Sequence, residues 1–245
     1  MSTALGPVIP QSPVAARGKD RRFYTVMAVA IALTVFAGFA PTFYLRGFFE
    51  QKKELTSLVI FHGILFSSWI VLFVTQVRLV AAKRTDIHRK LGVVGAILAA
   101  AMPVVGVLAA IASAKRGFTP PNGPPPLVFM AIPLTDMIVF PALVGCALVF
   151  RRRSDVHRRL MLLGTLAILT PAIARMGFIR PYGVLAFLGV TDLFILTSIT
   201  YDRIRNGRFH PAFLWGGLFI VASQAFRLVF ARTEAWHGIA TWLTR

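Results

Sequence analysis

Six polar side chains interrupt the apolar stretches of this 245-residue sequence and are its best candidates for chemistry. Five are ionisable and the sixth is an amide: His62, Asp136, Arg175, Asp192, Arg227 and Gln224. Ionisable groups inside membrane-spanning segments are costly and mark functional sites by default. Counted from the ends of their helices at about 1.5 Å per residue, all six fall in the same half of the membrane. They predict one outward-facing polar cavity for a proton, a cation or a small substrate.

Asp136 has the most distinctive surroundings of the six. Pro133 and Pro141 flank it, and each proline frees a backbone carbonyl and is expected to kink the helix. Many carriers coordinate a cation or proton with a carboxylate beside such freed carbonyls. Asp192 follows a threonine, as Asp136 does. We expect the two aspartates to bind the proton or cation, His62 and Gln224 to line the site, and the two arginines to attract or neutralise an anionic group.

Other interpretations of the same residues stay open. The aspartates can pair with the arginines in a purely structural network that fixes helix register. His62, Asp136 and Asp192 also offer the ligands of a divalent metal, as in a membrane-embedded metal-dependent enzyme acting on a lipid-like substrate. Haem is a weaker alternative, because bis-histidine ligation needs two histidines on facing helices. His237 is the only plausible second ligand on the same side of the membrane as His62. No cofactor is predicted, and a non-catalytic subunit of a membrane complex is a further alternative.

The composition places these residues in a membrane protein. Hydrophobic residues make up 56% of the chain, charged residues only 15%, and the mean hydropathy is +0.70. Seven apolar runs, each long enough to cross a core of about 30 Å, lie at 23–44, 56–81, 91–112, 127–150, 160–178, 183–201 and 211–231. None alternates with the period of two that a β-barrel requires. The sequence predicts an all-α polytopic bundle of seven transmembrane helices, one helix followed by three helical hairpins.

The basic residues predict the orientation of this bundle. The N-terminal tail and alternate loops hold sixteen Lys and Arg, whereas the opposite side holds eight. Cytoplasmic segments carry such an excess, so we expect the N-terminus inside and the C-terminus outside. We interpret 1–22 as a disordered basic cytoplasmic tail, 23–231 as the membrane domain and 232–245 as an amphipathic interfacial segment. The net charge of +18 is then explained by membrane topology. We expect the basic loops to bind anionic lipid headgroups and not nucleic acid.

A seven-residue motif occurs twice in the chain. Residues 85–91 (Thr-Asp-Ile-His-Arg-Lys-Leu) recur at 154–160 as Ser-Asp-Val-His-Arg-Arg-Leu. In each copy the hydroxyl residue suits a helix N-cap, the aspartate suits the first turn, and the basic pair suits lipid phosphates. An alternative brings His88, His157 and His210 together as a three-histidine metal site or proton relay.

The first copy lies in a stretch that resembles a family pattern. His62, Trp69, Gln76 and Leu79, followed by His-Arg-Lys-Leu-Gly at 88–92, are similar to a hairpin of uncharacterised bacterial polytopic membrane protein families. Those families also pair an intramembrane histidine with a His-Arg-x-Leu-Gly loop. The resemblance implies a multi-pass protein of the bacterial inner membrane. It implies no chemistry, because those families have no assigned activity.

Overall fold

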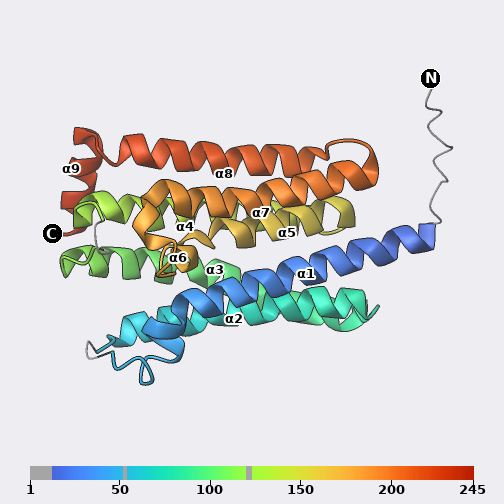
Figure 1. The fold of residues 1–245 in the computed structure, drawn as a ribbon, viewed down its shortest axis with the longest axis horizontal. Coiled ribbons are helices and arrows are strands. Elements are labelled where there is room, and N and C mark those ends of the chain that lie inside the picture. The colour runs from blue at the N-terminus through green and yellow to red at the C-terminus, as the bar shows by residue number, and fades with distance from the viewer. Residues whose placement is uncertain (1–12, 52–53, 120–122) are drawn as a thin grey trace.

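The structure is a computed structural model that describes residues 13–51, 54–119 and 123–245. This part of the chain is helical and contains no strand, and its long helices run side by side (Figure 1). The long helices are α1 (Pro13–Phe39), α2 (Ser57–Ala81), α3 (Thr85–Lys115), α4 (Pro126–Val149), α5 (Ser154–Ala167), α7 (Gly183–Asn206) and α8 (Pro211–Phe230). The shorter elements are the π-helical turn η1 (Ala40–Tyr44), α6 (Thr170–Ile173), the 3-10 turn η2 (Arg180–Tyr182) and α9 (Glu234–Leu243).

Seven helical segments within the described ranges are long and apolar enough to cross a membrane. They are α1 with η1, α2, α3, α4, α5 with α6, η2 with α7, and α8. The chain is therefore a multi-pass membrane protein, and the predicted all-α bundle of seven spans is confirmed. The α2–α3, α4–α5 and α7–α8 connections lie at one end, here called the basic end (Figure 1). The end at which η1 and α9 lie is called the opposite end.

The fifth span is broken where the sequence predicts one continuous run over 160–178. α5 ends at Ala167, and Pro171 lies in the first turn of α6. A proline lacks an N–H and its ring clashes with the carbonyl four residues earlier, which here belongs to Ala167. α6 ends at Ile173, so Arg175 lies in the turn after the span and not inside it. The expected placement of Arg175 within a span was wrong.

Both boundaries of the expected membrane domain can be compared with the structure. α1 begins at Pro13, so residues 13–22 are helical where the sequence predicts a disordered tail. The rest of that expected tail, 1–12, lies outside the described residues. At the other boundary, α9 crosses the opposite end of the bundle (Figure 1). Trp236 of α9 is buried and donates a 2.9 Å hydrogen bond to the carbonyl of Leu127, while Trp242 is exposed.

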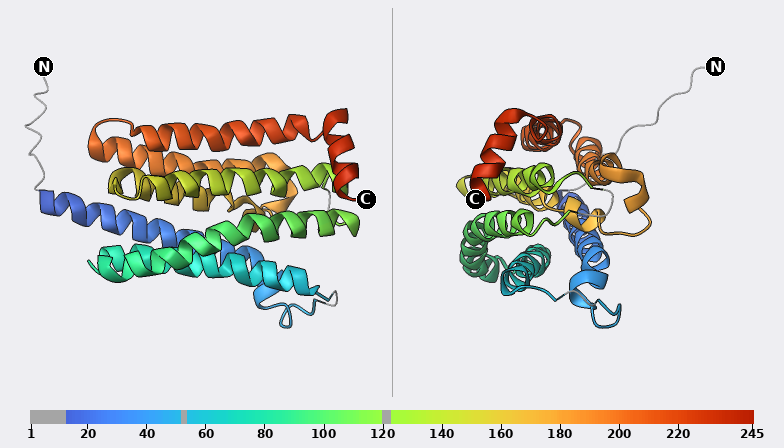
Figure 2. Two further views of the ribbon diagram at one scale, coloured as in Figure 1. Left: turned by 180° about the vertical axis from the view of Figure 1, so that it is seen from behind. Right: turned by 90° about the vertical axis from the view of Figure 1, so that its left-hand side faces the viewer.

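α5 occupies the middle of the bundle, and α2 and α3 stand at its edge (Figure 2). Within the protein, 72% of the fifth span is buried, whereas the figure for α2 and for α3 is 22%. Leu162, Leu163 and Leu166 of α5 are fully buried in the main hydrophobic core. The two copies of the repeated motif, which open α3 and α5, therefore lie in opposite environments.

Candidate functional site

The α4 and α8 helices are joined by a buried ion pair. Arg227 Nη1 donates to Asp136 Oδ1 at 2.6 Å, and both side chains are only 2% exposed. The guanidinium also lies near the Ile132 carbonyl and the Ser223 hydroxyl, each at 3.5 Å. Asp136 is thus neutralised by a fixed cation, as the structural interpretation of these residues requires.

Asp192 of α7 has a different neighbour. Its Oδ1 accepts a 3.1 Å hydrogen bond from Nε2 of the buried Gln224. Gln224 lies three residues before Arg227 on α8, so the two side chains share a helix face. Within the described ranges, no cationic side chain lies within ion-pair distance of Asp192. Four of the six predicted site residues therefore gather where α4, α7 and α8 meet, and one of them is a half-buried carboxylate without a counter-charge.

His62 and Arg175 belong to a separate group. The His62 ring stacks on Phe66 with centroids 4.1 Å apart. Arg175 lies over the Phe39 ring at 4.5 Å and donates to the Pro171 carbonyl at 2.7 Å. It is close enough to His62 for their charges to interact. The predicted cluster of six is therefore divided between two places.

The candidate metal ligands are not brought together in the part of the chain that the structure describes. Among the described residues, no three His, Cys, Asp or Glu side chains are arranged to hold a metal ion. His62, Asp136 and Asp192 are included in that finding, and so are the three histidines of the loops. The rings of His88 and His157 contact each other, with centroids 6.4 Å apart. This is not the pair His62 and His237 that the haem alternative requires.

None of the six residues lines either of two grooves found on the described part of the molecule. The larger, about 540 Å³, lies between η1, α2 and α3. The smaller, about 190 Å³, is lined by Met27, Leu193, Phe194 and Thr197. The outward-facing polar cavity stays a prediction.

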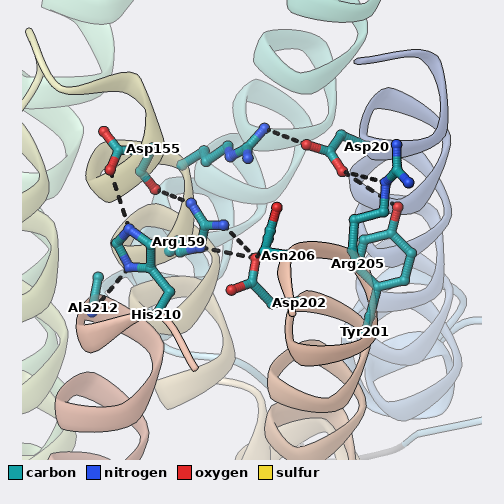
Figure 3. Close-up of polar contacts among 10 residues, drawn as sticks. Asp20, Asp155, Arg159, Tyr201, Asp202, Arg205, Asn206, His210 and Ala212 are labelled. Carbon is teal, nitrogen blue, oxygen red and sulfur yellow. Dashed lines mark hydrogen bonds and ion pairs between the residues drawn. The ribbon is translucent and has the colours of Figure 1, made fainter. Parts of the chain in front are cut away.

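A second polar network with a buried ion pair involves residues that sequence reasoning assigned to loops. Arg159 of α5 forms a buried ion pair with Asp202 of α7 through two of its nitrogens (Figure 3). Its third nitrogen donates to the Asp155 carbonyl at 2.6 Å, and Asn206 donates to Asp202 at 2.8 Å. The guanidinium also faces the Phe213 ring at 5.6 Å. Arg159 therefore connects α5, α7 and α8 through a buried guanidinium.

Asp20 is the centre of the adjacent network (Figure 3). Arg158 Nη1 lies 2.9 Å and Arg205 Nε 3.8 Å from its carboxylate, and the Tyr201 hydroxyl donates to it at 3.4 Å. Through these contacts α1 is tied to α5 and α7. Asp20 falls within the segment that the sequence predicts to be a disordered tail, so sequence reasoning missed it.

The loop histidines have local roles that differ from one another. His157 Nδ1 donates to the Ala147 carbonyl at 2.8 Å. His210 accepts from the Ala212 amide through Nδ1, which caps α8, and donates from Nε2 to Asp155 at 3.1 Å. Because His210 is engaged with Asp155, only two of the three histidines meet. The alternative in which all three histidines converge is not what the structure contains.

A signal for Arg159 and Asp202 exists in the sequence. The repeated motif has lysine at position 90 and arginine at 159, and arginine forms buried pairs more readily because its planar guanidinium presents several fixed donors. Asp202 is also an acidic residue among the arginines of a basic loop.

No protein-family model, curated protein or solved structure matches the chain.

Proposed function

We propose that this protein is a small proton-coupled carrier, oriented with its N-terminus in the cytoplasm of a bacterial inner membrane. Asp192 is its proton-binding group. The hydrogen bond from Gln224 of α8 changes when Asp192 takes up a proton. The Asp136–Arg227 ion pair fixes the register of α4 against α8. The proposal keeps the expected carrier activity but assigns the two aspartates different roles.

The contrast between the two aspartates supports this assignment. Asp136 is 2% exposed and faces a guanidinium at 2.6 Å, so its negative charge is compensated inside the protein. In the described ranges, Asp192 accepts a 3.1 Å hydrogen bond from the Gln224 amide and has no cation within ion-pair distance. An intramembrane carboxylate without a counter-charge gains more from taking up a proton than one that is paired.

Gln224 gives the proton a route to a conformational change. Its amide donates to Asp192 when that carboxylate is charged, and its carbonyl oxygen can accept when the carboxyl carries the proton. The switch requires the amide to rotate by half a turn. Gln224 and Arg227 lie three residues apart on α8, so the contact that senses the proton and the ion pair to α4 are on the same face of one helix.

Proton flux in liposomes tests the proposal. The purified protein is reconstituted with a pH-sensitive dye inside the vesicles, and a pH gradient is imposed across the membrane. We expect flux in the wild type and at least a tenfold reduction in Asp192→Asn, which keeps the size and the Gln224 contact but removes the charge. Asp86→Asn, which alters an exposed carboxylate at the basic end, is the matched control and should leave flux unchanged.

Two results would overturn the carrier assignment. One is wild-type flux no faster than that of empty liposomes. The other is Asp192→Asn flux equal to wild type in vesicles that contain the same amount of folded protein. Asp136→Asn is expected to lower thermal stability first, because it leaves Arg227 buried and unpaired.

A further inference from the structure

The larger groove has the lining of a hydrocarbon site. It is lined by residues of η1, α2 and α3, and α2 and α3 stand at the edge of the bundle (Figure 2). Along α2 it extends from Ile64 to Thr75, roughly 16 Å at 1.5 Å per residue. Its volume of about 540 Å³ lies within the range of ordinary ligand sites.

The hydroxyl groups in this groove are already hydrogen-bonded within the protein, and that of Tyr44 in η1 lies 2.8 Å from Ser67 Oγ. Ser67 donates to the Gly63 carbonyl at 2.6 Å, Ser68 to the Ile64 carbonyl and Thr75 to the Val71 carbonyl, each at 2.8 Å. Their hydrogens are therefore used within α2, and the groove presents mainly methyl and methylene groups. This chemistry suits an acyl chain and not a sugar or nucleotide.

Cations flank the groove at the basic end. Arg78 lies three residues after Thr75 on α2, and Lys90 lies four residues before Val94 on α3, so each cation shares a helix face with a groove residue. Both side chains are exposed. In the described part of the chain neither has an acidic partner, whereas Arg158 and Arg159 of the second motif copy pair with Asp20 and Asp202.

We propose that the groove binds one anionic phospholipid. Its acyl chain lies between α2 and α3, and its phosphate lies between Arg78 and Lys90. The two observations that carry the proposal are independent: an apolar groove of lipid-accessible shape, and two uncompensated cations on the same helix faces at its end. The site is separate from the proposed carrier site on α4, α7 and α8.

Native mass spectrometry of the detergent-purified full chain tests this site with phosphatidylglycerol and phosphatidylcholine as probes. A basic side chain beside an anionic lipid contributes roughly fivefold to binding. Arg78→Gln/Lys90→Gln is therefore expected to weaken phosphatidylglycerol binding about 30-fold and to leave phosphatidylcholine binding unchanged. The matched control is Arg89→Gln/Arg152→Gln, which removes two exposed charges from the same end but off the groove, and should retain wild-type binding.

A second variant tests the acyl-chain part of the site. Val94→Trp fills the groove from a position already 46% exposed, so it should not disturb the core, and it is expected to reduce the tightly bound phosphatidylglycerol population at least fivefold. The proposal is overturned if the two charge variants weaken binding equally, since that indicates a general charge effect. It is also overturned if Val94→Trp binds like wild type, or if the wild type binds the two lipids equally.

Discussion

The two copies of the repeated motif differ in nearly every contact they make, although their sequences are almost the same. In the first copy, at the start of α3, Asp86 pairs with the exposed Arg84, and Arg89 and Lys90 are exposed. In the second copy, at the start of α5, four successive polar side chains reach four different helices. Asp155 contacts α8, His157 contacts α4, Arg158 contacts α1 and Arg159 contacts α7. Position in the bundle, not the motif, decides whether these side chains hold the fold together.

The largest difference is expected at the second basic position of each copy. Arg159→Leu leaves Asp202 buried without its cation and should lower the free energy of unfolding by about 3–5 kcal/mol. The equivalent Lys90→Leu removes an exposed side chain and should cause no measurable loss. Unfolding in mixed detergent and SDS micelles, followed by tryptophan fluorescence, measures both.

A double variant serves as the control for this comparison. Arg159→Leu/Asp202→Leu removes both charges, so it should recover much of the stability lost in Arg159→Leu. Equal losses in Arg159→Leu and Lys90→Leu would show that the second copy is no more structural than the first.

A difference of opposite sign is expected at the glycine that follows each motif. Gly95 and Gly164 occupy equivalent positions in the repeat. A Cβ on Gly164 would lie 2.8 Å from Val144 Cγ2, a stiff, buried side chain, whereas a Cβ on Gly95 would lie at an ordinary 3.4 Å from Leu72. Gly164→Ala should therefore destabilise the protein by about 1 kcal/mol net of its helix propensity. Gly95→Ala should stabilise it by about 0.5–1 kcal/mol in the same unfolding assay, and equal signs would contradict the comparison.

The smallest difference is expected at the aspartate of each motif. Asp155→Asn weakens the contact with His210, which is partly exposed, and should cost about 0.2–1 kcal/mol. Asp86→Asn should leave the melting temperature unchanged, because its contact with Arg84 is exposed at the surface. High salt should reduce the Asp155 effect and should not create one at Asp86. A larger loss for Asp86→Asn would invert the expected ranking.

The spans were predictable because their signal is local. Runs of apolar residues long enough to cross a bilayer need no knowledge of their neighbours, so seven spans follow from length and composition. The break before α6 was also accessible in principle, since Pro171 cannot continue a helix from Ala167. The apolar run nevertheless continues past Arg175, so hydropathy alone places the end of the span too late.

The candidate site was only partly predictable. The sequence correctly singles out Asp136, Arg227, Asp192 and Gln224 as polar groups in apolar surroundings, and the structure joins them as an ion pair and a hydrogen-bonded pair. Which aspartate meets a cation depends on how α8 is rotated against α4 and α7. Equal depth along the membrane also led to His62 being grouped with them, because depth carries no information on which helices are neighbours.

The sequence by itself determined that the chain is a seven-span helical membrane protein with its basic residues gathered in alternate connections. The spans follow from the free energy of placing each residue in lipid or in water, and the alternation of the basic residues is the bias that loops on one side of a membrane carry. Only the tertiary structure decided that one copy of the motif is a surface feature and the other a central junction. Arg159 and Asp202 are 43 residues apart in sequence, so they can pair only if α5 and α7 pack side by side. The hydrophobic core that surrounds α5 determines this packing.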